Sequence, residues 1–117
     1  MSDYVIYHNP RCSKSRQTLA LLNEQGIEPE IVLYLDATPS LDELKAIIDK
    51  LGISARDLLR KGEDAYKEYN LADETLSEDK IISAMIEAPK LIERPIVIKG
   101  DRAILGRPPE NVLQLNQ

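Results

Sequence analysis

The sequence contains no phenylalanine or tryptophan, only one cysteine, Cys12, and only one histidine, His8. A single cysteine excludes an internal disulfide. With a single histidine it also argues against a thiolate metal centre, which needs several such ligands. No stretch approaches the roughly 20 apolar residues that span a membrane, and no secretory signal is visible at the start. We therefore expect a cytoplasmic protein with no metal and no membrane partner.

Basic residues are too few to draw the chain to nucleic acid. The 117 residues include 15 Lys and Arg against 20 Asp and Glu, which gives a formal net charge of −5. No long basic run is present, so we expect no nucleic-acid partner. Hydrophobic residues make up 43% of the chain, which suits one domain with a core of Leu, Ile, Val and Ala.

The first third of the chain has the pattern of a strand, a helix and a second strand. Residues 4–8 are β-branched and aromatic, and residues 13–25 are good helix formers. Residues 30–35 (EIVLYL) form an apolar run, which is typical of a strand buried on both faces. The spacing predicts a parallel β-α-β unit.

The middle of the chain has helical periodicity, and its end returns to strand character. Capping residues predict helix starts after Ser40, Ser54 and Ser77. Two short apolar strands then flank a Gly-Asp pair at residues 100–101, a good hairpin turn, and a helix follows. The predicted order is β-α-β, a helical middle, and β-β-α.

Cys12 falls where the first strand gives way to the first helix. The first turn of a helix exposes unpaired N–H groups and the positive end of the helix dipole, and both stabilise a thiolate. Arg11, Lys14 and Arg16 add positive charge nearby. This context favours a reactive thiol over the alternative of a small buried apolar side chain. For His8 alone, a structural histidine is the simpler interpretation.

Two better-known cysteine motifs are absent. A dithiol redox site needs Cys-x-x-Cys, but Ser15 stands in place of the second thiol. A low-molecular-weight tyrosine phosphatase loop needs an arginine six places after the cysteine, where this chain has Thr18. The site can therefore form a mixed disulfide but cannot resolve it alone, so an external thiol must be the reductant.

Three arginines occupy positions suited to an anion site. Arg94 precedes the first strand of the predicted hairpin, Arg107 follows its second strand, and Arg60 ends a short helix. A guanidinium binds tetrahedral oxyanions in bidentate fashion, so these side chains predict an oxyanion pocket above the thiolate. The alternative is that each arginine is a solvated surface charge.

Four stretches of the sequence occur in the order of one known family: YHNPRCSKSRQTL, GISARDLLRK, ERPIV and LGRPPENVL. The chain thereby resembles the glutaredoxin-dependent arsenate reductase family, and in particular its short members with an NPRCSKSR opening. The resemblance implies an α/β, thioredoxin-like fold. It also implies a single domain over residues 1–117 with a helical insertion at about 38–88.

The resemblance further implies roles for individual residues. Cys12 would be the catalytic nucleophile that attacks arsenate. Three arginines would hold the oxyanion, namely Arg60, Arg94 and Arg107. His8 and Ser15 would support a lowered thiol pKa, and Pro95 would follow a cis peptide bond.

By the same resemblance, glutathione would be a co-substrate and glutaredoxin would regenerate the thiol, with no bound cofactor. The chain departs from the family at Gly106, where some members carry a second cysteine, and at Glu93, which adds a negative charge beside the proposed pocket. Two alternatives stay open. One is a monothiol glutaredoxin-like enzyme, and the other is a non-catalytic protein that binds a partner, like the related transcription regulators.

Overall fold

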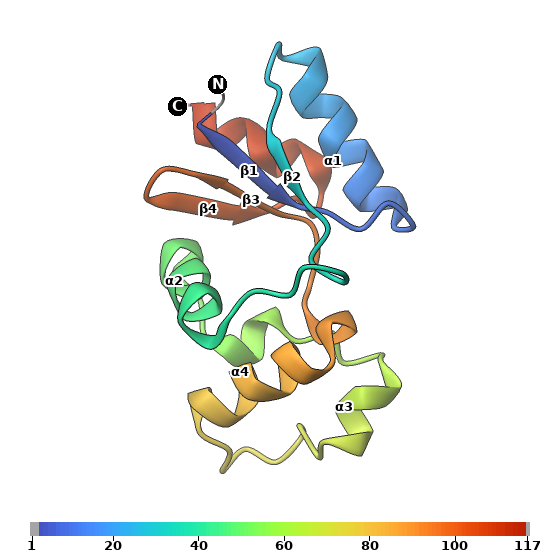
Figure 1. The fold of residues 1–117 in the computed structure, drawn as a ribbon, viewed down its shortest axis with the longest axis vertical. Helices are drawn as coiled ribbons and strands as arrows, with labels where there is room; N and C mark the ends of the chain where they lie inside the picture. Colours follow the sequence, from blue (N-terminus) through green and yellow to red (C-terminus); the bar gives the residue numbers. More distant parts are fainter. Residues whose placement is uncertain (1–2, 117) are drawn as a thin grey trace. The chain divides into compact units, whose positions relative to one another are not determined.

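The computed structural model describes residues 3–116. Contacts divide the chain into two units, one formed by residues up to 37 together with residues from 94 onward, and the other by residues 38–93. The first unit holds the strands of the sheet and the second is helical (Figure 1).

The first unit contains a four-stranded mixed sheet with strand order β2-β1-β3-β4. Its elements are β1 (Tyr4–Tyr7), α1 (Ser13–Glu24), β2 (Glu30–Val32), β3 (Ile96–Lys99) and β4 (Arg102–Leu105). Strand β1 pairs in parallel with β2 and antiparallel with β3, and β3 pairs antiparallel with β4. This is the predicted β-α-β and β-β arrangement, and the thioredoxin-like fold class is confirmed.

The core of this unit lies where α1 and a C-terminal 3₁₀ helix, η3 (Pro109–Asn116), pack over the central strands. Leucine and valine side chains from both helices meet the inward side chains of β1 and β3. The buried cluster consists of Tyr4, Ile6, Leu22, Val97, Val112 and Leu115. Period-two burial along β1 fits a strand with one face on this core.

Strand β2 differs from its prediction. The run EIVLYL was predicted to be buried on both faces, but β2 is an edge strand, and Ile31 and Leu33 are 47% and 41% exposed. The strand also ends early, because the Leu33 carbonyl accepts hydrogen bonds from the N–H groups of Asp36 and Ala37 and so turns the chain. The burial prediction was wrong because an apolar run alone does not distinguish central from edge strands.

The second unit consists of short helices in the order α2 (Leu41–Leu51), η1 (Ala55–Leu58), α3 (Asp64–Glu68), α4 (Glu78–Glu87) and η2 (Pro89–Leu91). Its buried apolar side chains come from all of these elements except α3. They include Leu44, Ile47, Ile48, Leu58, Ile81, Ile82, Met85 and Leu91. The helical character predicted for this part of the chain is confirmed.

Helix caps in the second unit follow the sequence closely. Ser40 and Glu43 form a capping box at the start of α2, in which each side chain accepts from the other residue's backbone N–H. Ser77 caps α4 in the predicted way. Gly52 ends α2 with φ 70°, a left-handed conformation that glycine adopts without strain.

Candidate functional site

Cys12 is the N-cap residue of α1. Its carbonyl accepts the first helical hydrogen bond, from the Arg16 N–H at 3.0 Å, and its own N–H donates to the Asn9 carbonyl at 3.0 Å. The Asn9 side chain also accepts from the Arg11 N–H at 3.0 Å, which forms an Asx turn. The segment between β1 and α1 is therefore fixed by local hydrogen bonds, and it holds Cys12 at the start of the helix.

The thiol of Cys12 has a lowered pKa. Partial burial acts to raise the pKa, but the Ser15 backbone N–H, the Arg94 side chain and the Lys14 backbone N–H all hydrogen-bond the sulfur and lower it. These donors favour the thiolate because they interact with its full negative charge. These hydrogen bonds to the sulfur support the prediction of an ionised thiol at a helix start.

Ser15 and His8 lie together beneath this turn. Ser15 is fully buried, its Oγ is 2.6 Å from His8 Nδ1, and it accepts a hydrogen bond from the Asn9 N–H at 3.1 Å. Burial, and then the nearby charge of Arg16, lower the pKa of His8, so the imidazole is neutral at neutral pH. His8 thus acts on the position of Ser15 and of the turn, not through a positive charge.

Arg94 links the thiol to a buried tyrosine. Burial acts to lower the pKa of Arg94, but hydrogen bonding to Cys12 and the contact with Tyr34 raise it. Tyr34 is fully buried. Sequence reasoning missed Tyr34, because it sits inside an apolar run and nothing in the run marks it as a polar partner. Tyr34 thus interacts with the same guanidinium that contacts Cys12.

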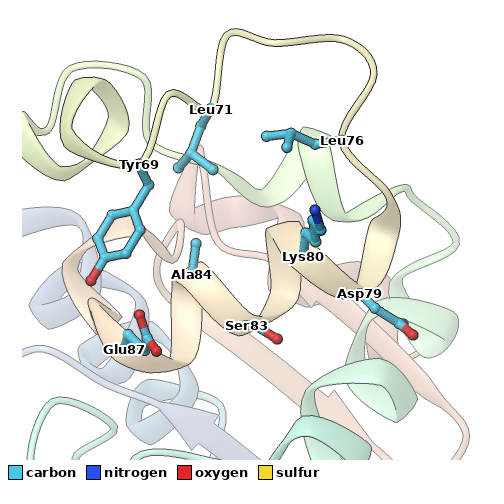
Figure 2. Close-up of a pocket in the computed structure, with 8 residues that line it drawn as sticks. All are labelled: Tyr69, Leu71, Leu76, Asp79, Lys80, Ser83, Ala84 and Glu87. Carbon is cyan, nitrogen blue, oxygen red and sulfur yellow. The ribbon is translucent and has the colours of Figure 1, made fainter.

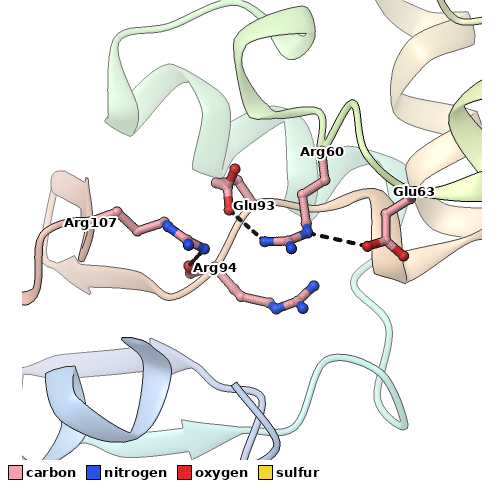
Figure 3. A network of polar contacts seen from close by, with 5 residues as sticks. All are labelled: Arg60, Glu63, Glu93, Arg94 and Arg107. Carbon is pink, nitrogen blue, oxygen red and sulfur yellow. Dashed lines mark hydrogen bonds and ion pairs between the residues drawn. The ribbon is translucent and has the colours of Figure 1, made fainter. Parts of the chain in front are cut away.

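The two arginines that flank the hairpin are brought together in this unit. Strands β3 and β4 pair in register, and beyond them the Gly106 N–H donates to the Pro95 carbonyl at 3.0 Å. The Arg107 guanidinium then reaches the Arg94 carbonyl at 3.2 Å (Figure 3). The peptide bond between Arg94 and Pro95 is cis. These hydrogen bonds hold together the two chain segments that carry Arg94 and Arg107. Arg94 also contacts the thiol.

Arg60 lies in the second unit and has carboxylate partners there. Its Nη1 donates to Glu93 Oε1 at 2.9 Å, and its Nε is 3.6 Å from Glu63 Oε2 (Figure 3). Backbone hydrogen bonds bring Arg60 and Glu93 onto neighbouring segments, because the Arg60 N–H donates to the Leu91 carbonyl and the Glu93 N–H to the Leu58 carbonyl. An oxyanion-binding role for Arg60 stays a prediction.

A separate cavity of about 330 Å³ lies within the helical unit (Figure 2). Its lining is largely apolar, with Tyr69 hydrogen-bonded to Glu87 at one end. The lining residues are Tyr69, Leu71, Leu76, Asp79, Lys80, Ser83, Ala84 and Glu87. The lining includes neither a cysteine nor an arginine, so this cavity offers no comparable chemistry.

Two features are absent from residues 3–116. No group of three or more His, Cys, Asp or Glu side chains is placed to hold a metal ion in that part of the chain. Of the helices there, none combines the length and the apolar composition needed to cross a membrane.

Comparison with known proteins shows strong similarity over nearly the whole chain. Residues 7–115 match the ArsC family. An uncharacterized protein of Escherichia coli K12, YfgD, is 57% identical over 94% of this chain and 93% of its own length. An arsenate reductase of Haemophilus influenzae is 52% identical over 95% and 97%. The structure of an arsenate reductase from Vibrio cholerae superposes with a TM-score of 0.93 at 54% identity and covers 95% of both chains.

Proposed function

The chain belongs to the ArsC family, and from that premise we propose that it reduces arsenate to arsenite with Cys12 as the nucleophile. The observation that carries this assignment is the contact between the Cys12 thiol and the Arg94 guanidinium at the start of α1. A thiolate and a fixed cation side by side are what nucleophilic attack on a tetrahedral oxyanion requires.

In the first step the Cys12 thiolate attacks arsenic and displaces one oxygen as water, with protons taken from solvent. The product is a cysteinyl-arsenate in which arsenic is still in the +5 state. The Ser15 and Lys14 N–H groups favour the thiolate before attack. Arg94 stabilises negative charge on the arsenate oxygens as the S–As bond forms.

The second step needs an outside thiol, because Cys12 is the only cysteine. We propose glutathione for this role. Its sulfur adds to arsenic with loss of a second water, and two electrons then pass from the two sulfurs to arsenic. One water adds back to arsenic, arsenite leaves in the +3 state, and a disulfide between Cys12 and glutathione remains. A glutaredoxin thiolate attacks the glutathione sulfur of this disulfide and releases the Cys12 thiol.

We assign oxyanion binding to Arg94 and Arg107. Arg94 contacts the thiol directly, and Arg107 is tethered to the Arg94 carbonyl. His8 and Ser15 support the turn that presents Cys12. The family resemblance implies a third oxyanion contact from Arg60, and the Arg60→Ala variant tests it by its effect on arsenate affinity. A reducing compartment such as the cytoplasm would keep Cys12 in the thiol form.

The test is a coupled assay of arsenate-dependent NADPH oxidation with glutathione, glutathione reductase and glutaredoxin. Wild-type protein should turn over arsenate, and Cys12→Ser should have no measurable activity, because a serine hydroxyl is hardly ionised near pH 7. No turnover by wild-type protein with a demonstrably reduced thiol would refute the assignment.

A double variant separates this function from a monothiol glutaredoxin-like activity. Deglutathionylation of a peptide disulfide needs Cys12 but no convergent guanidinium groups. Arg94→Ala/Arg107→Ala should therefore lose arsenate turnover. If wild-type protein deglutathionylates the peptide efficiently and shows no response to arsenate, the glutaredoxin-like alternative is favoured instead.

A further inference from the structure

Gly106 lies at a very close approach of three chain segments. It follows β4, it is buried, and a Cβ atom at this position would lie 2.6 Å from Thr18 Oγ1 and 2.8 Å from Pro95 Cγ. It would also lie 3.0 Å from Thr18 Cγ2. Non-bonded carbon and oxygen atoms do not approach so closely without repulsion. No residue other than glycine fits here unless a neighbour moves.

Neither neighbour can move at small cost. Thr18 is fully buried in α1, and its Oγ1 donates to the Lys14 carbonyl at 2.8 Å and lies 3.3 Å from the Gly106 carbonyl oxygen. Its β-branched side chain has few rotamers in a helix. The Pro95 ring is buried and has no flexible end. A side chain at position 106 would therefore displace the backbone after β4.

This backbone carries the anion-binding groups. The Gly106 N–H donates to the Pro95 carbonyl at 3.0 Å, and the next residue, Arg107, donates to the Arg94 carbonyl at 3.2 Å. On the other side of the contact, Thr18 belongs to the helix whose N-cap is Cys12. Gly106 thus stands between the helix that presents the thiol and the segments that present both guanidinium groups.

We propose that Gly106 is a positioning residue, whose missing side chain lets the Arg94 and Arg107 segments close onto α1 and so fixes both guanidinium groups relative to Cys12. The proposal rests on the proposed function, because it gives Gly106 a task only if those groups act together on an oxyanion.

The closing experiment uses Gly106→Ala in the full chain. The pH profile of Cys12 alkylation should shift to higher pH than in wild-type protein, and arsenate should protect the thiol about 10–100-fold less well, as expected for a misplaced binding group. The matched control is Gly62→Ala, because a Cβ at Gly62 meets nothing within 4 Å. That control should leave both readouts unchanged.

A double variant tests whether the contact itself is responsible. Thr18→Ala removes two of the three atoms that a Cβ at position 106 would meet, and leaves only Pro95 Cγ. Gly106→Ala should therefore do much less harm in a Thr18→Ala background than in wild-type protein, a non-additivity typical of residues in contact. If Gly106→Ala does not fold, Thr18→Val serves instead. It keeps the shape but loses the hydroxyl beside the Gly106 carbonyl, and should raise the midpoint of the alkylation profile.

Three outcomes decide the matter. A shifted profile and weakened protection with unchanged circular dichroism support the proposal, as does a shifted profile in Thr18→Val. Wild-type values for both readouts in Gly106→Ala, or in Thr18→Val where the first variant is unfolded, overturn it. If arsenate fails to protect Cys12 even in wild-type protein, the proposed function fails, and that result is distinct because it precedes any substitution.

Discussion

The helical unit and the sheet unit differ in how they carry charge. Residues 38–93 hold 13 acidic and 8 basic side chains, which accounts for the whole net charge of −5, whereas the rest of the chain holds 7 of each. The sheet unit is therefore electrically neutral overall, yet it gathers arginine and lysine around one thiol. An arsenate dianion is attracted by such a local arrangement and not by the net charge of the molecule.

Two arginines show the same contrast at close range. The Arg94 guanidinium faces a thiol and a phenol, whereas the Arg60 guanidinium is held by the carboxylates of Glu93 and Glu63. Both residues looked equivalent in the sequence. The two guanidinium groups therefore differ in their partners, because one is paired with carboxylates and the other with the thiol proposed as the nucleophile.

The largest expected effect comes from Arg94→Ala, which removes the guanidinium that faces the thiol and so ends the contrast with Arg60. We expect kcat/KM for arsenate to fall by about 10²–10³-fold, or about 2.7–4 kcal/mol, as for loss of one preorganised donor to a developing oxyanion. The pKa of Cys12 should rise, because a hydrogen bond and a positive charge are lost. The coupled assay and the alkylation pH profile measure the two effects.

The matched control for this prediction is Arg102→Ala. Arg102 lies in β4 of the same unit, and its guanidinium donates to the Gln114 carbonyl at 3.0 Å. It should leave both kcat/KM and the thiol pKa close to wild-type values. Equal losses in the two variants would mean that Arg94 acts through general charge and not through its contact with Cys12.

A core substitution in each unit sharpens the comparison. Met85→Ala in the helical unit and Leu22→Ala in the sheet unit both remove fully buried side chains, and each should lower the free energy of unfolding by about 3 kcal/mol. Met85→Ala should leave the pKa of Cys12 unchanged, because every group that shifts it lies outside residues 38–93. Denaturant titration and thiol alkylation provide the measurements. A changed thiol pKa in folded Met85→Ala would contradict the independence of the site.

Most of the fold could be predicted from the sequence because its signals are local. The capping box at Ser40, the left-handed Gly52 and the hairpin turn after β3 each depend on residues a few positions apart. The burial of β2 could not be predicted, because the place of a strand in a sheet depends on contacts far away in the sequence. An apolar run has the same sequence pattern in an edge strand as in a central strand of a sheet.

The candidate site, like the fold, has a part that could be predicted from neighbouring residues and a part that could not. The thiol at the helix start was predictable, since Cys12, Lys14 and Ser15 are neighbours in sequence. The contacts of Arg94 with Tyr34, and of Gly106 with Thr18, join segments between 60 and 88 residues apart, and no local pattern marks them. Only the tertiary structure shows which polar residues meet.

A smaller effect is expected from Ser40→Ala in the helical unit. The substitution removes the hydrogen bond that Ser40 Oγ accepts from the Glu43 N–H in the capping box at the start of α2, and should lower the free energy of unfolding by about 1 kcal/mol. Ser83→Ala is the matched control, because Ser83 is exposed inside α4 and caps nothing. A destabilisation by Ser83→Ala as large as that by Ser40→Ala would show that the cap is not the cause. Urea titration measures both variants.

The smallest effect is a pH dependence from histidine, which only the sheet unit can supply because residues 38–93 contain no histidine. The pKa of His8 is lowered from 6.5 in the folded protein, first by burial and then by Arg16. The unfolded chain therefore binds the proton more readily, so this contribution to stability is complete above pH 6.5 and is lost as the pH falls toward the lowered value.

His8→Asn keeps a polar atom near Ser15 but does not titrate, so the difference in unfolding free energy between wild-type protein and this variant should shrink or reverse between pH 7 and pH 5. Carboxylates that titrate at the acid end of this range do so in both proteins and cancel in the difference. Urea titrations at several pH values give the difference directly. A difference that stays constant over this range would show that His8 is not held neutral by its surroundings, and the view that it supports Ser15 without contributing charge would have to be abandoned.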